Sequence, residues 1–76
     1  REAEERRRRE ALIQDAMSWE RARSVRRYLR AVARAATENG GSSEPDFVRW
    51  LHWANGVARG LDPIARDAAT REDSPM

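Results

Sequence analysis

The chain has 76 residues, a formal net charge of +2, one His and no Cys. This length allows one small domain. The lack of Cys excludes disulfides and zinc–thiolate sites, and one His excludes a multi-histidine metal centre. No apolar run approaches the roughly 18 residues that a membrane-spanning helix needs, and the charged start lacks the apolar core of a signal peptide. We therefore expect a soluble, cytoplasmic protein with no membrane partner, and the charged start suggests a piece of a longer polypeptide.

The first half of the chain predicts one long helix. Residues 1 to about 38 contain no Gly or Pro and consist mainly of Arg, Ala, Glu and Leu, which favour helix. Apolar residues recur there at steps of three or four and form one stripe. The stripe comprises Leu12, Ala16, Trp19, Ala22, Val25, Leu29, Val32 and Ala36, broadened by Tyr28 and Ala33. Ahead of this stripe, residues 1–11 are expected to be a charged helical extension, such as the end of an upstream coiled coil.

The string "NGGSSEPDF" that follows predicts the end of one helix and the start of another. Asn39 or Gly40 can take the left-handed conformation of a C-terminal cap. Ser43 is expected to cap the next helix, with Asp46 completing a capping box. Pro45 suits the first turn, where its missing N–H does no harm.

The second helix is expected over about 44–60, with Gly60 as its C-terminal cap. A short third helix is expected over about 63–69, capped by Asp62 and with Pro63 in its first turn. The second helix carries its own apolar stripe at helical spacing. This stripe comprises Phe47, Trp50, Leu51, Ala54, Val57, Ala58 and Leu61.

The connection between the two stripes is only about five residues long, so an all-α fold built on an antiparallel αα-hairpin is expected. The hairpin domain is predicted to span residues 12–70, after the extension 1–11 and before a frayed tail at 71–76.

The aromatic residues divide between core and partner contacts. Trp50 is expected in the core, with Trp19 and Tyr28 interdigitating. Trp53 lies toward the edge of the second stripe beside Gly56, which leaves room for another backbone. For the Trp53 ring, burial in the core and contact with a partner are equally open alternatives. Because Trp and Tyr are enriched in binding hot spots, the candidate partner interface is Trp53, Gly56, Trp19 and Tyr28.

All cationic residues are Arg, and no acid occurs from Arg21 to Thr37. A basic face opposite an apolar stripe could bind phosphates or an acidic protein surface. An ordinary solvated helix face, in a genome that uses Arg in place of Lys, explains the same pattern. The candidate phosphate-binding or acidic-partner face comprises Arg23, Arg26, Arg27, Arg30 and Arg34.

No catalytic pattern is present in the sequence. His52 has no Cys, Asp or Glu at ligand spacing on its helix, and the carboxylates are better explained as caps and surface groups. The string "GGSSEP" lacks the GK[ST] of a phosphate-binding loop. We expect no enzymatic activity, no cofactor and no metal.

Two strings, "SWERARSVRRYLRAV" and "FVRWLHWANGVARGLDPI", carry a resemblance. The chain resembles the C-terminal region of a set of uncharacterised bacterial proteins, in which a coiled coil precedes the pattern W-x-x-A-x-x-(I/V)-R-x-Y, then WL-x-WA, then LDP. The doubled Arg in "RSVRRY" departs from this pattern. The matching residues are Trp19, Ala22, Val25, Arg26 or Arg27, Tyr28, Trp50, Leu51, Trp53, Ala54, Leu61, Asp62 and Pro63. The resemblance implies a helical end-piece after a coiled coil, and it implies no activity.

These observations favour a non-enzymatic helical module for protein–protein interaction or oligomerisation, at the C-terminal end of a larger bacterial protein. Its expected partner is another protein chain, an upstream domain of the same protein or a second copy. The alternative is sequence-tolerant nucleic-acid binding to the phosphate backbone through the Arg face of the first helix.

Overall fold

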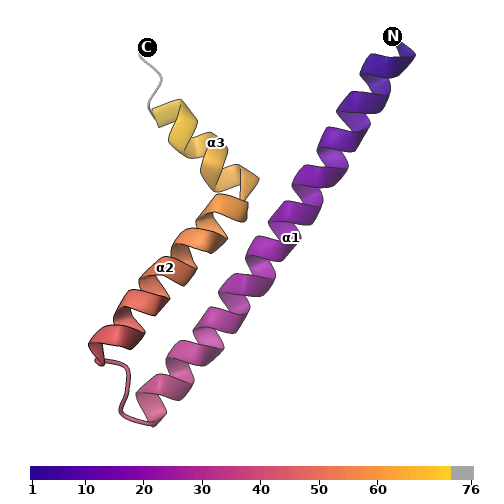
Figure 1. Cartoon of the computed structure of the whole chain (residues 1–76). Coiled ribbons are helices and arrows are strands. Elements are labelled where there is room, and N and C mark those ends of the chain that lie inside the picture. The colour runs from indigo at the N-terminus through magenta and orange to yellow at the C-terminus, as the bar shows by residue number, and fades with distance from the viewer. Residues whose placement is uncertain (73–76) are drawn as a thin grey trace.

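A computed structural model describes residues 1–72, and these form three helices without a strand. The helices are α1 (Glu2–Glu38), α2 (Pro45–Leu61) and α3 (Pro63–Glu72), shown in Figure 1. The predicted all-α class and the three helices are confirmed. The third helix runs three residues beyond its predicted end at 69, and the remainder of the predicted tail, residues 73–76, lies outside the described residues.

The end of α1 is a Schellman motif built around Gly40. The Gly41 N–H donates to the carbonyl of Ala36 at 2.8 Å, and the Gly40 N–H donates to that of Thr37 at 3.2 Å. Gly40 has a φ of 76°, which a side chain would make costly, whereas Asn39 has a right-handed φ of −91°. Of the two predicted cap residues, Gly40 is therefore the one in the left-handed conformation.

The start of α2 differs from the predicted capping box. Pro45 is the first helical residue, as expected, but the N-cap is Glu44 and no side chain hydrogen-bonds at this cap. The reason is that a residue before Pro is restricted to extended conformations, and Glu44 has φ −60° and ψ 127°. Ser43 therefore lies one residue too early to cap. Asp46 pairs instead with Arg49 on the next turn.

The end of α2 is set by Pro63 and not by the predicted cap Gly60. The cause is again the restriction that a proline imposes on the residue before it. Asp62 precedes this proline and is extended, with φ −84° and ψ 109°, so the helix, which includes Gly60, ends at Leu61. The Asp62 carboxylate then caps α3: its Oδ1 accepts hydrogen bonds from the N–H groups of Ile64 at 2.9 Å and Ala65 at 3.4 Å. The predicted capping role of Asp62 and first-turn position of Pro63 are confirmed.

After the loop, α2 returns alongside the C-terminal half of α1, and α3 diverges from it (Figure 1). Later residues of α2 and α3 meet earlier residues of α1. Leu29 and Ala33 lie beside Leu51, Arg26 meets Asp62, and Asp15 meets Arg66. The hairpin contact between α1 and α2 is thus present. No helix within residues 1–72 is long and apolar enough to cross a membrane.

The buried core is smaller than the two stripes predict. Among the described residues its buried apolar side chains are Ala22, Leu29, Ala54 and Ala58. Several residues expected in the stripes are instead exposed, since one neighbouring helix can cover only part of a broad stripe. These exposed residues are Leu12, Ala16, Tyr28, Trp50 and Val57.

The molecule is one layer of helices thick. Its principal extents are 58 × 29 × 14 Å and its radius of gyration is 17.0 Å. A compact chain of this length has a radius of gyration of about 11 Å. Domains ordinarily bury their apolar faces between two layers of secondary structure. Both broad faces of this hairpin therefore lie at the surface.

Candidate interaction surface

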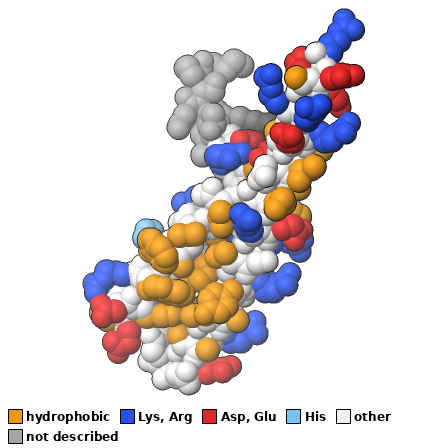
Figure 2. Space-filling model, turned by 45° about the vertical axis from the view of Figure 1, so that its right-hand side comes forward, with side chains coloured by type: hydrophobic (Ala, Val, Ile, Leu, Met, Phe, Trp, Pro, Cys, Tyr) orange, Lys and Arg blue, Asp and Glu red, His pale blue; other side chains and the backbone are white. Residues whose placement is uncertain are grey.

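One broad face of the hairpin is apolar and aromatic. Tyr28 of α1 is 62% exposed, and on α2 Trp53 is 64%, Val57 40% and Trp50 39% exposed. The α2 residues follow one another at steps of three and four, which places them on one side of that helix. Figure 2 shows hydrophobic side chains gathered into one area across α1 and α2. We call these four residues, Tyr28, Trp50, Trp53 and Val57, the aromatic face.

The other broad face of the hairpin has a different lining. A shallow groove there runs between the helices and is lined by Arg26, Leu29, Arg30, Ala33, Leu51 and Asn55. The Asn55 side chain is held by its own helix, donating to the Leu51 carbonyl at 2.9 Å. The hairpin thus has an aromatic side and a side edged by arginines.

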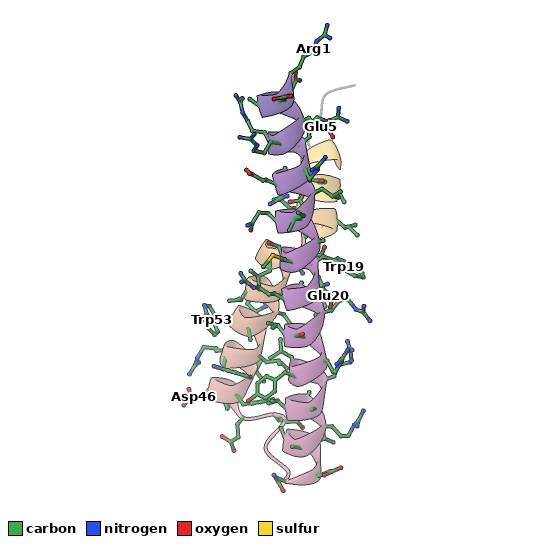
Figure 3. The ribbon with its side chains drawn as sticks, turned by 90° about the vertical axis from the view of Figure 1, so that its right-hand side faces the viewer. Arg1, Glu5, Trp19, Glu20, Asp46 and Trp53 are labelled. Carbon is green, nitrogen blue, oxygen red and sulfur yellow. The ribbon has the colours of Figure 1, made fainter. Side chains whose placement is uncertain are left out.

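Trp19 does not join the aromatic face. Figure 3 shows Trp19 and Trp53 projecting in opposite directions from the hairpin. The guanidinium carbon of Arg23 lies 4.9 Å from the centre of the Trp19 ring, a cation–π arrangement, and Trp19 is half-buried. Of the four predicted interface residues, the structure brings Trp53 and Tyr28 to one side and leaves Trp19 on the other.

Gly56, the fourth predicted interface residue, faces open space. A Cβ placed on it would meet no other atom within 4 Å. Nothing inside the described chain therefore requires glycine at this position.

Trp50 is oriented by a ring neighbour one turn earlier. Its ring and that of Phe47 have centroids 6.2 Å apart and planes 27° apart, an offset stack within the favourable range for aromatic pairs. Phe47 itself is half-buried against the hairpin. The stack holds one edge of the aromatic face in place, whereas Trp53 has no ring partner among the described residues.

Charged residues of both signs border the aromatic face at its ends. Arg21 lies on α1 at helical spacing before Val25 and Tyr28, and it forms no ion pair among the described residues. Asp46 lies on α2 at helical spacing before Trp50 and Trp53, and it is 93% exposed although it pairs with Arg49. Sequence reasoning placed Asp46 in a cap and overlooked Arg21. The helical spacing was the signal that could have found both.

We call the five predicted arginines of α1 the arginine face, and two of them make contacts within the chain. The five are Arg23, Arg26, Arg27, Arg30 and Arg34. Arg26 donates to Asp62 at 2.7 Å, and Arg23 lies on Trp19 and 3.9 Å from a Glu20 carboxylate oxygen. The remaining three, Arg27, Arg30 and Arg34, are exposed and make no ion pair within residues 1–72. The structure thus leaves three of the five predicted arginines available to a ligand.

Asp62 is the one buried charged residue among those described, and its side chain is 9% exposed. The hydrogen bond from Arg26 holds the pKa of the Asp62 carboxyl below its ordinary value of 3.8, assisted by the Ala65 and Ile64 N–H groups, while burial opposes the shift. The sequence suggested only its capping role. The pairing with Arg26, 36 residues away, carries no local signal.

No chemistry-bearing cluster is evident in the described part of the chain. No three His, Asp or Glu side chains in residues 1–72 gather in a metal-binding arrangement, and His52 is exposed. The arrangement therefore offers surfaces for binding, of which the aromatic face is the most apolar. Comparison of the chain with protein-family models, with curated proteins and with solved structures finds no match.

Proposed function

We propose that this chain is a non-enzymatic interaction or oligomerisation module, an antiparallel helical hairpin whose aromatic face is buried against another polypeptide. The observation that carries the proposal is the exposure of Trp53 and Tyr28, at 64% and 62%, in a molecule one helical layer thick. Aromatic rings are the side chains that most often dominate the binding energy of protein interfaces. Here they lie together while the chain's own core consists mainly of alanine.

The energetics support the same proposal. Large apolar side chains left in water forgo about 1.5–3 kcal/mol each relative to burial. No large side chain in the described residues is fully buried. A hairpin of this size gains little from its own core, and a partner on the aromatic face supplies the missing second layer. The prediction that the module closes a longer bacterial polypeptide stays a prediction.

Photo-cross-linking tests this proposal. A benzophenone amino acid replaces Trp53 in one variant and Arg27, which lies on the arginine face, in a matched control. Both full-length chains are irradiated in the cells that produce them. We expect an adduct with a second polypeptide from position 53 and not from position 27. Equal yields at both positions, or none at 53, would overturn the proposal.

The second candidate is binding to a phosphate backbone. Arg27, Arg30 and Arg34 favour it because they are exposed and carry no carboxylate partner among the described residues. Three contacts correspond to a slope of about −3 in the dependence of log affinity on log salt. This is a weak site by the standard of specific DNA-binding proteins, so we place it second.

A further inference from the structure

We propose that the occupant of the aromatic face is a second copy of this chain, related by a two-fold axis, so that two hairpins form a four-helix arrangement. The inference rests on the proposed function and names its partner. Two-fold dimers are the commonest soluble oligomers, and their interface must be complementary to itself. The aromatic face suits such an interface in its exposed area and in the charges at its two ends.

The area of the aromatic face suits a dimer of modest size. The exposed parts of its four side chains amount to roughly 450 Å² per chain, taking about 150–250 Å² for a whole side chain of this kind. Two copies would bury roughly 900 Å² from these residues alone. The contact is extended by the half-buried residues Val25, Val32 and Phe47 and by the charged residues Arg21 and Asp46. It then approaches the size of a standard interface, which buries about 1,200–2,000 Å².

The charges at the border are arranged for self-association. Leu29 of α1 and Ala54 of α2 lie at the same level of the hairpin, since Leu29 lines one groove with Leu51 and Asn55. Arg21 lies eight residues before Leu29, and Asp46 lies eight residues before Ala54. Because α2 returns along α1, these two equal steps lead to opposite ends of the face (Figure 1).

A two-fold axis that lies in the plane of the face and runs across the helices exchanges the ends of the face. It lays α1 of one copy over α1 of the other and brings Arg21 of each copy to the same end of the dimer as Asp46 of the other. Each end of the dimer then carries one such Arg and one such Asp, with aromatic rings between the two ends. Figure 3 shows α3, in pale yellow, on the side of α1 from which Trp19 projects, so α3 leaves the face open.

The first experiment measures the mass of the whole chain by sedimentation equilibrium over a range of concentrations. We expect twice the chain mass of 8.8 kDa. Trp53→Ala should weaken the dimer by about 30-fold or more, as for an interface hot spot, whereas Trp19→Ala on the opposite side should change it by less than about threefold. A mass of one chain at every concentration, a larger assembly, or equal effects of the two substitutions would overturn the proposal.

The second experiment uses the symmetry of the charges. Arg21→Asp alone and Asp46→Arg alone each place like charges together at both ends of the dimer, so each variant should be monomeric. An equimolar mixture should form the heterodimer, because both pairs are then of opposite sign. Arg27→Asp, the same charge change off the face, should dimerise like the original chain. Helicity measured by circular dichroism verifies that each variant is folded. A mixture that stays monomeric, with both variants folded, would overturn the two-fold arrangement.

Failure of the dimer and failure of the proposed function give different results. If the chain is monomeric in solution yet position 53 cross-links to a different polypeptide, the interaction module stands and the second copy is the wrong occupant. If position 53 forms no adduct and the chain is monomeric, both are overturned.

Discussion

Arg26 and Asp62, 36 residues apart, tie α1 to the junction of α2 and α3 through a hydrogen bond of 2.7 Å between Nη1 and Oδ2. The other carboxylate oxygen, Oδ1, caps α3 by accepting from Ile64 and Ala65. Each oxygen of one carboxylate thus has a separate task. The three helices are held at one point by this side chain.

Substitutions of Asp62 should separate its two tasks. Asp62→Asn keeps an oxygen for the cap but loses the charge facing Arg26, whereas Asp62→Ala loses both. We expect thermal unfolding midpoints in the order original chain, Asn, Ala, with the loss of the cap alone worth about 5 °C. Asp67→Asn, an exposed change in the same helix, is the control and should have little effect. Equal midpoints for Asn and Ala would mean that the cap contributes nothing.

The stability should fall at low pH through Asp62. Its pKa in the folded chain lies below the unfolded value of 3.8, so the folded state binds fewer protons and is favoured at higher pH. This contribution is fully present above pH 3.8 and is lost as the pH falls through the lower, folded pKa. The difference in unfolding midpoint between the original chain and Asp62→Asn should therefore shrink below that pH. A difference that grew on acidification would contradict the assignment.

Two glycine-to-alanine changes should have opposite effects on stability. Gly40→Ala forces a side chain into the left-handed conformation at φ 76° and should destabilise the fold by about 1 kcal/mol. Gly56→Ala lies within α2, where an added Cβ meets nothing within 4 Å, and should stabilise it by about 0.5–1 kcal/mol. Urea unfolding measures both. Weaker self-association of Gly56→Ala would instead show that a partner approaches this glycine.

The arginine face should respond unevenly to neutralisation. Replacing Arg27, Arg30 and Arg34 together by Gln should reduce the salt concentration needed to elute the chain from a heparin column, because these guanidinium groups are exposed. Arg26→Gln should reduce this salt concentration less than Arg27→Gln, Arg30→Gln or Arg34→Gln alone, since Arg26 is paired with Asp62. Unchanged elution of the triple variant would remove this face as a polyanion site.

The positions of the proline residues explain where local reasoning failed at helix ends. The string "SEPD" contains a good capping pattern, yet the restriction that Pro45 imposes on Glu44 moves the helix start past Ser43. Pro63 likewise makes Asp62 extended, so α2 ends at Leu61 and not at Gly60, the residue that suggested an end. In both cases the steric effect of proline on the preceding residue outweighed a weaker cap signal.

Local sequence signals determined, to within a few residues, which parts of this protein form helices, and the apolar periodicity determined which sides of those helices are apolar, because both depend on neighbours within one or two turns. Tertiary structure decided how much of each apolar side is covered. A single facing helix buried Ala54 and Ala58 while leaving most of Trp53 and most of Tyr28 in water. It also decided that Arg26 meets Asp62 and that Trp19 lies opposite Trp53, since both depend on how the chain folds back after Gly40.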